Sequence, residues 1–439
     1  MSTRERLRRT FSSLENRNYR LYFAGQTVSI TGTWMQRVSQ AWLVLELTDS
    51  GTLLGVTAAL QHLPFLLVGV WGGLLADRVD KRRLLLCTQA CSGLLAFVLG
   101  LLVLTGRVEL WMVLLLAVGL GTINSLDHPA RNSFVLEMVG PEHVTNAVTL
   151  NSVTVNLGRA VGPAVAGALI AAFGLAAAFM VNAASFVAVL LALALMRARD
   201  LHRAMPSGKG KRQLRAGFEH VRGSPDLTGP MMLLTMVGLF AVEFQVKIPL
   251  LARYAFGGDA QTYGMMFSVM GVGAVLGGLG VASSLRPTRR VLLITAMLFG
   301  AVIVLTAYSP SLPLAYVAIF ALGAANIAFK STAMSMLQLH ADPAMRGRVM
   351  SISGLALRGT TPLAAPVAGW LAEQAGARFA LGFGGAITMI TAVITYDYLR
   401  RSSRAATRPA GGAAADPITT APQSSGQAAP PRSSDLLEP

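Results

Sequence analysis

Long apolar runs constrain the fold of this chain more than any other feature of its sequence. A helix needs about 20 mostly apolar residues to cross the hydrocarbon core of a bilayer, and windows of that length occur at twelve places. They lie approximately at 19–47, 51–76, 84–105, 110–136, 147–173, 175–197, 227–251, 263–285, 291–308, 313–340, 349–374 and 377–399. Only 13% of the residues are charged, against about a quarter in soluble proteins. The sequence therefore predicts an all-α integral membrane protein with twelve transmembrane helices.

Polar segments divide these helices into two sets of six. The sequence predicts a basic cytoplasmic N-terminal segment over residues 1–18 and an N-terminal six-helix bundle over 19–199. A polar connector over 200–226 leads to a C-terminal six-helix bundle over 227–400. The tail, 401–439, is rich in Ala, Pro, Ser and Gly and has little to bury, so we expect it to be disordered and cytoplasmic.

The formal net charge of +16 is explained by topology. Lys and Arg gather before the first helix, in the loop at 78–83, in the connector and after residue 400, whereas the opposite face receives only Arg107, Arg253 and Arg378. Cytoplasmic loops are enriched in Lys and Arg, so we expect both termini in the cytoplasm and the protein in the inner (plasma) membrane. A nucleic-acid partner is not expected, because the basic residues punctuate apolar runs instead of covering one solvated face.

The two sets of helices share a pattern at a constant offset of 202 residues. Gly121 matches Gly323, Asn124 matches Asn326, and Gly174 matches Gly376 in one register without a gap. Gly and Asn residues that match in one register indicate that the two six-helix sets arose by a parallel duplication. One class of transporters has this architecture, with the substrate site near the membrane midplane between the halves.

Two motifs carry a resemblance to a known family. The stretch GLLADRVDKRR at 73–83 resembles the signature between helices 2 and 3 of the major facilitator superfamily, except that Asp80 stands where that family usually has Gly. The stretch GRAVGPAVAG at 158–167 is similar to the helix-5 motif of exporters that run as antiporters. The wider sequence resembles the drug:proton antiporter branch that contains enterobactin exporters and macrolide efflux proteins. The resemblance implies two six-helix bundles around a central cavity.

The first motif implies a gate at the cytoplasmic surface. Its members in this chain are Gly73, Asp77, Arg78 and Arg82, and the resemblance gives Asp77 a basic partner on helix 4, for which we expect Arg131. The alternative is that the cations only anchor the topology, which we favour for Lys81 and Arg83. Acids contribute little to topology, so this alternative does not explain Asp77.

The helix-5 motif has two readings, of which ordinary packing has at least as much weight as a functional role. Its small residues allow close backbone approach and a bend, which is ordinary packing. The functional reading depends on Arg159, a cation inside the membrane that must find an internal partner. The motif residues are Gly158, Arg159, Gly162, Pro163 and Gly167.

Ionisable residues inside apolar helices are costly and are therefore candidate functional groups. The candidates for proton coupling are Glu243, Asp127, Glu46 and His62. Asp127 with Arg131, and Glu243 with Lys247, each stand four residues apart, so self-contained ion pairs are the alternative. We favour that alternative for Asp127, a proton carrier for Glu243 and a structural role for His62. The candidates for the substrate cavity are Trp34, Arg37, Gln40, Asn124, Asn326, Lys330 and Arg358.

These features predict a proton-driven efflux antiporter that exports a bulky amphipathic molecule, such as an antibiotic or siderophore, by alternating access. An importer of the same fold is the alternative. A membrane-embedded enzyme is disfavoured, because the sequence has no Gly-x-Ser-x-Gly motif and no clustered His. It also has no Gly-x4-Gly-Lys-Ser/Thr loop for a nucleotide. We expect no cofactor and no metal, only a proton gradient, a small-molecule substrate and the lipid bilayer as partners, and a monomer.

Overall fold

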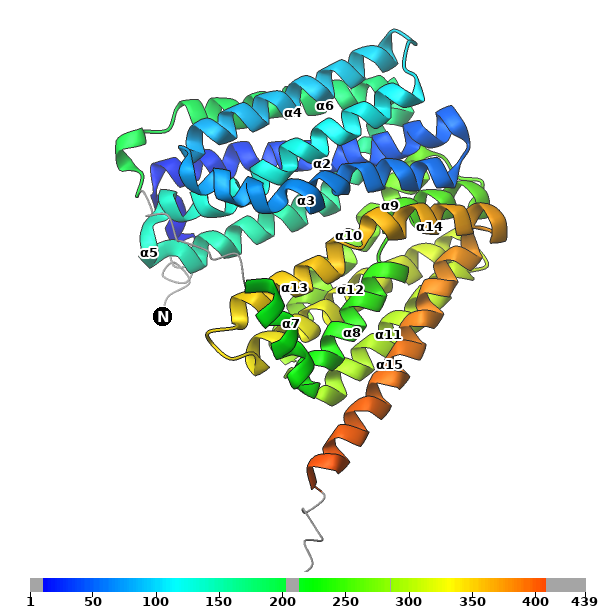
Figure 1. Ribbon diagram of the computed structural model, residues 1–439. Helices are drawn as coiled ribbons and strands as arrows, with labels where there is room; N and C mark the ends of the chain where they lie inside the picture. The colour runs from blue at the N-terminus through cyan, green and yellow to red at the C-terminus, as the bar shows by residue number, and fades with distance from the viewer. Residues whose placement is uncertain (1–10, 203–212, 285, 408–439) are drawn as a thin grey trace, which may run out of the picture.

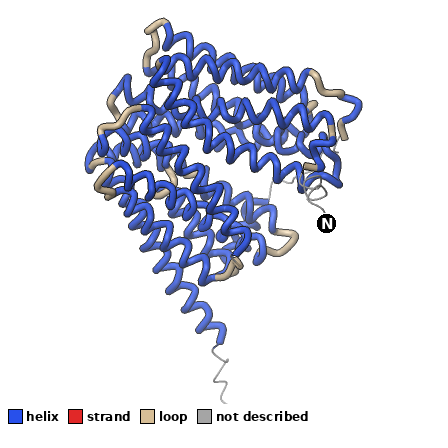
Figure 2. The backbone as a smooth tube through the Cα atoms, turned by 180° about the vertical axis from the view of Figure 1, so that it is seen from behind, coloured by secondary structure: helices blue, strands red, loops and turns tan. Residues whose placement is uncertain are grey.

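The computed structural model describes residues 11–202, 213–284 and 286–407, and within these ranges it is helical and contains no strand (Figures 1 and 2). The side chains of residues 70–77, 141, 213–215, 281–284 and 405–407 lie outside the description. The prediction of an all-α membrane protein is confirmed.

The N-terminal half consists of long antiparallel helices after one short turn. They are η1 (Ser12–Glu15), α2 (Arg17–Thr48), α3 (Gly51–Arg78), α4 (Lys81–Leu104), α5 (Leu110–Phe173) and α6 (Leu175–Ala194). Helix α5 joins the two spans that we expected at 110–136 and 147–173, with a kink at Gly140, where φ is +69°. The helices alternate in direction because residues Asp49–Ser50 and Gly174 leave room only for tight turns.

The connector and the C-terminal half contain more breaks. They comprise η2 (Ala198–Asp200), α7 (Gln213–Gly223), α8 (Pro225–Phe240), α9 (Phe244–Leu250), η3 (Leu251–Ala255), α10 (Ala260–Ser284), α11 (Arg289–Ala307), α12 (Leu312–His340), α13 (Arg346–Arg358), α14 (Thr361–Ala375) and α15 (Ala377–Thr407). The span expected at 227–251 is bent by 41° between α8 and α9, and the span expected at 349–374 is broken between α13 and α14.

Nine helical stretches of the described residues are long and apolar enough to cross a membrane, or ten if the bent pair α8–α9 is one span. The other two expected spans are α2 and the pair α13–α14. Helix α2 carries many polar residues, and α13 and α14 have only 13 and 15 residues each. The count of twelve therefore stays a prediction for these two.

Two boundaries differ from the sequence prediction. Helix α15 continues to Thr407 instead of ending near residue 400, since Ala and Arg favour helix and Arg401 pairs with Asp397 at 2.6 Å. Part of the connector is also helical: α7 packs against α13, where Gly217 lies beside Arg348 and Ile352. The rest of the predicted tail, 408–439, and the first ten residues of the basic segment lie outside the described residues.

The sequence duplication has a structural counterpart in helix packing. A Cβ atom on Gly121 of α5 would lie 2.4 Å from the carbonyl oxygen of Gln61 on α3, and one on Gly323 of α12 would lie 2.0 Å from that of Met270 on α10. The equivalent glycines thus allow the same close helix approach within each half. Gly174 and Gly376, also 202 residues apart, both have a positive φ between consecutive helices.

The two halves meet through two equivalent helix pairs. A Cβ atom on Gly369 of α14 would lie 1.9 Å from the Gly51 carbonyl oxygen of α3, and one on Gly264 of α10 would lie 2.4 Å from the Pro163 carbonyl oxygen of α5. The halves converge where α3 begins and α14 ends, and they diverge toward the end of the bundle that holds the start of the chain (Figure 1). We call these the converging end and the N-terminal end.

Candidate functional site

Four cations from both halves gather between the bundles. Arg37 comes from α2 and Arg159 from α5, whereas Lys330 and Arg358 come from α12 and α13. The charges of Arg159 and Arg358 act on Arg37 and also on Lys330. We call these four residues the cation cluster, and no salt bridge joins any of them to another described residue.

An indole ring holds two of these guanidinium groups. The Cζ atom of Arg37 lies 4.6 Å from the centre of the Trp34 ring, and that of Arg159 lies 5.0 Å from it. The attraction between a cation and an aromatic face is worth about 0.5–2 kcal/mol, so it can hold the guanidinium groups without neutralising them. Trp34 itself contacts Phe267 of the other half, with ring centres 6.1 Å apart.

Several polar atoms beside the cluster have no hydrogen-bond partner among the described residues. They include Nε of Arg159, Nε2 of Gln40 and Oδ1 of Asn326, whose residue is only 8% exposed. Gln40 accepts a hydrogen bond from Gln61 at 3.0 Å, and both residues line a cavity of about 20 Å³ with Arg37. Buried polar groups are normally hydrogen-bonded, so such orphaned atoms indicate places for water or a ligand.

Glu243 lies at the break between α8 and α9, where it is 8% exposed. Its carboxylate accepts a hydrogen bond from Thr361, and the charges of Lys247 and Lys330 act on it. The ammonium group of Lys247 donates to the Phe240 carbonyl oxygen and forms no salt bridge with Glu243. The structure therefore shows no direct Glu243–Lys247 ion pair, although the Lys247 backbone N–H donates to the Glu243 carbonyl oxygen at 3.0 Å and so keeps the helical spacing of four.

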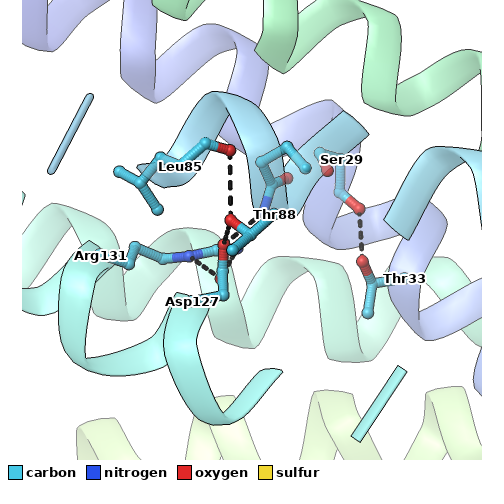
Figure 3. A network of polar contacts seen from close by, with 7 residues as sticks. Ser29, Thr33, Leu85, Thr88, Asp127 and Arg131 are labelled. Carbon is cyan, nitrogen blue, oxygen red and sulfur yellow. Dashed lines mark hydrogen bonds and ion pairs between the residues drawn. The ribbon is translucent and has the colours of Figure 1, made fainter. Parts of the chain in front are cut away.

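Asp127 has a complete set of partners inside the N-terminal half (Figure 3). Arg131 donates to its Oδ2 from Nε at 3.0 Å, and Thr88 and Gln89 donate to its Oδ1 at 2.8 Å and 2.7 Å. The structure thus contains the ion pair that we favoured over a proton carrier. Arg131 forms this pair. The side chain of its other expected partner, Asp77, lies outside the described residues. For Gly73 of the same motif, only the helical backbone is described.

The rest of the 73–83 motif is bound within one half. Lys81 is buried and contacts Glu137 of α5 at 2.6 Å, so it is not a surface cation, and a role as topology anchor alone does not explain this pair. Arg82 donates to the carbonyl oxygens of Leu193 and Ala194 at the end of α6, whereas Arg78 is exposed. Asp80, the departure from the family pattern, caps α4 by accepting from the Arg83 backbone N–H at 3.0 Å.

The glycines of the helix-5 motif contact both halves. Gly158 and Gly162 pack against Ile30 and Thr31 of α2, whereas Pro163 and Gly167 meet α10 of the other half. The packing reading is therefore visible in the structure. Arg159, which the sequence left without a partner, stands over Trp34 at the point where α5 meets α10.

The remaining candidates do not all lie together, although the charges of Arg37 and Arg358 act on His62. The Nδ1 atom of His62 lies 2.9 Å from the Ala58 carbonyl oxygen, which agrees with a structural histidine. Glu46 is exposed and accepts from the indole N–H of Trp42 at 2.7 Å. Asn124 is half-buried on α5. The charges that act on Asp127 are those of Arg131 and His128 and not those of the cation cluster.

Sequence reasoning missed a set of polar contacts at the converging end. Glu373 of α14 accepts from the Ser50 hydroxyl at 2.5 Å and from the Thr52 backbone N–H at 3.0 Å. Arg253 contacts Asp49 at 2.7 Å, and the Tyr254 hydroxyl donates to the same carboxylate at 2.8 Å. We call these six residues the polar latch. Its only sequence signal was the short polar turn after residue 48, which named no partner.

Another hollow, of about 450 Å³, is lined by Asn16, Arg17 and residues 199–202. Its described lining belongs to the N-terminal half and the start of the connector. Within the described residues, no group of three His, Cys, Asp or Glu side chains could hold a metal ion.

Comparison with known proteins agrees with this geometry. Residues 8–418 match the family described as transmembrane secretion effector. The staphyloferrin A transporter of Staphylococcus aureus is 24% identical and covers 78% of this chain and 86% of its own. The multidrug efflux pump Tap of Mycolicibacterium fortuitum is 27% identical, covering 81% and 89%. The enterobactin exporter EntS of Escherichia coli is 28% identical, covering 75% and 79%.

Solved structures share the fold. An inward-facing, unoccupied bacterial homologue of the human lysosomal transporter Spinster has a TM-score of 0.65 at 17% identity, covering 90% of this chain and 97% of its own. The nucleoside transporter NupG has a TM-score of 0.66 at 14% identity, covering 90% and 100%. These matches confirm the resemblance seen in the two sequence motifs. The chain belongs to the transmembrane secretion effector family, a multi-pass group of the major facilitator superfamily whose members are transporters and not enzymes.

Proposed function

We propose that this chain is a secondary active exporter that expels a bulky amphipathic small molecule in exchange for protons. In this proposal it works as a monomer in the inner (plasma) membrane, with the N-terminal end in the cytoplasm and the converging end at the outer face. It needs no cofactor, metal, nucleotide or nucleic acid. The names of two relatives, an efflux pump and an enterobactin exporter, support export over import.

The observation that carries the proposal is the place of Glu243. This buried carboxylate sits at a break in the helix path, and the charges of Lys247 and Lys330 act on it. Lys330 in turn belongs to the cation cluster. Protonation of Glu243 removes one negative charge beside the cluster, so a proton and a substrate at this site influence each other through Lys330.

A proton gradient supplies enough energy for such an exchange. Moving one proton across about 100 mV releases ~2.3 kcal/mol. This energy supports roughly a 50-fold concentration gradient of an exchanged neutral molecule, at about 1.4 kcal/mol per factor of ten.

The polar latch supports alternating access. Its contacts join the halves at the converging end, and they are exposed, so water can replace them at low cost when the halves separate. At the N-terminal end, by contrast, no salt bridge joins the described residues of α2 and α5 to those of α12 and α13, the four helices that carry the cation cluster. This arrangement suits a state that is closed to the outside and that loads from the cytoplasm.

Prediction one tests proton coupling with Glu243→Gln. The amide keeps the shape of the carboxylate but does not titrate, so proton exchange should be lost while the protein remains folded. The assay uses everted vesicles with a proton gradient reported by acridine orange, to which compounds from a susceptibility panel are added. The native protein should release protons with at least one compound that also accumulates less in cells carrying the chain.

The matched control is Glu142→Gln, which changes an exposed glutamate near the N-terminal end. It should exchange protons like the native protein. Full exchange by Glu243→Gln would assign coupling to Glu46, Asp127 or His62 instead. A compound that accumulates more in cells carrying the chain would show that the protein is an importer.

A further inference from the structure

The cation cluster has more positive charge than the described acids around it can neutralise. Arg37, Arg159 and Arg358 act on one another by repulsion, and the acid whose charge reaches Lys330 is Glu243, which also faces Lys247. Unpaired charges in a membrane protein are costly, and they normally pair with each other or with a ligand. A cluster of this kind can therefore accept an anion from outside the chain.

The site is open to such a ligand. Arg358 is exposed and Arg37, Arg159 and Lys330 are half-buried, although all four lie between the two halves. Two polar atoms at the site have no hydrogen-bond partner among the described residues. They are Nε of Arg159 and Oδ1 of the buried Asn326, which lies one turn before Lys330. The site is thus built from cations without a salt bridge to another described residue and from polar atoms without a hydrogen bond.

Its shape indicates the kind of anion. A guanidinium group presents a planar fork of N–H donors that matches a carboxylate in a bidentate manner. Three such forks from α2, α5 and α13, with one ammonium from α12, suit a molecule with more than one acidic group. The buried rings of Trp34 and Phe267 lie beside them, with ring centres 6.1 Å apart, and make that side of the site apolar and aromatic.

We propose that the cation cluster is the substrate site and that the substrate is a small aromatic or partly apolar molecule carrying at least two carboxylate or similar acidic groups. This inference rests on the proposed transport function, which by itself left the charge of the substrate open. Because the groups come from both halves, the anion would bridge them as they close around it.

The experiment compares two dyes with the same xanthene core and opposite charge. Fluorescein is a dianion at pH 8, whereas rhodamine 123 is a cation. Binding to the full chain, purified in detergent, is measured by fluorescence anisotropy. We expect fluorescein to bind at least about tenfold more tightly than rhodamine 123, since one charge-assisted hydrogen bond is worth about that factor. Equal binding of the two dyes would overturn the proposal.

Variants locate the binding site. Arg358→Gln changes an exposed residue and should weaken fluorescein binding about tenfold without affecting the fold. Arg159→Gln should do the same, and Arg159→Lys should restore part of the affinity because it keeps the charge but not the fork. The matched control Arg107→Gln removes an exposed arginine at the converging end and should leave the affinity unchanged. Unchanged affinity in both cluster variants would contradict the assignment.

Competitors distinguish a free acid from a lipid. Citrate should displace fluorescein, whereas short-chain phosphatidylglycerol should not; displacement by the lipid alone would mean that the cluster holds a lipid headgroup and not a substrate. The outcome is separable from that of the proposed function. If fluorescein binds and no compound drives proton exchange in vesicles, the anion site stands and the antiporter proposal fails. If only cationic compounds are exchanged for protons, the antiporter proposal stands and the anion site fails.

Discussion

At the scale of single residues, the charged side chains inside this protein differ in how they are paired. Asp127 and Arg131 neutralise each other within one half, Glu243 is buried near two lysines, and the cation cluster forms no salt bridge with another described residue. The sequence predicted which residues are costly, because charge in an apolar run is visible without a structure. It could not predict the partner of each charge. Glu137, for example, lies 56 residues from Lys81, and no local sequence pattern connects the two.

Prediction two concerns the buried pair of Lys81 and Glu137. Lys81→Gln leaves the Glu137 carboxylate buried and unpaired, so it should lower the free energy of unfolding by about 3–5 kcal/mol. The double variant Lys81→Gln with Glu137→Gln should recover much of that loss, because it removes both charges. Thermal unfolding in detergent measures the effect. Arg83→Gln, an exposed cation in the same turn, is the control and should change little; an equally mild Lys81→Gln would show that the pair is not needed.

At the scale of helices, length and hydropathy predicted the elements, while the breaks were not visible. The α4 segment was expected from residue 84 and begins at Lys81, because the Asp80 side chain caps it. The bend between α8 and α9 was missed, since residues 241–243 carry no Gly or Pro to announce a break. The packing of α3 on α14 and of α5 on α10 involves Gly369 and Gly167, which are also 202 residues apart.

Prediction three tests the latch between α3 and α14. Glu373→Gln weakens the acceptor for Ser50 and Thr52, which should favour separation of the halves at the converging end. The residue is exposed, so we expect a shift of about 1 kcal/mol, which is roughly a fivefold change in the ratio of open to closed states. Spin labels at Arg107 and Ser311, exposed positions in opposite halves, report the distance by double electron–electron resonance after Cys87 and Cys91 are replaced by Ser.

The control for the latch is Glu109→Gln. Glu109 is also exposed near the converging end, but it accepts from Trp111 of its own half and does not join the two halves. Its replacement should leave the label distances as they are. Identical distance distributions in native protein and Glu373→Gln would mean that the helix contacts through Gly51 and Gly369 hold the halves together without the latch.

At the scale of the whole molecule, the duplication explains why function lies between the halves. Each half repeats the same close approach of its helices. The cation cluster takes groups from α2 and α5 of one half and from α12 and α13 of the other, so it exists only where the two halves meet. The sequence indicated this arrangement through the offset of 202 residues and the charge asymmetry. It could not give the angle between the halves or their contacts, because these depend on residue pairs far apart in the sequence, such as Asp49 and Tyr254, 205 positions apart, and Ser50 and Glu373, 323 positions apart.

Prediction four tests the orientation of the whole bundle. Figure 1 places the start of α2, α7 and α13 toward one end, and the basic residues of the 78–83 loop and the connector belong to the same end of their helices. The positive-inside rule assigns that end to the cytoplasm. Reporter fusions after Leu201 and after Thr407, the last described residue of α15, should both score as cytoplasmic, whereas an insertion at Arg107 should score as external. An external score at Leu201 would contradict an even number of spans before residue 201, and one at Thr407 would contradict an even number before residue 407. Either result would also contradict the position of the polar latch at the outer face.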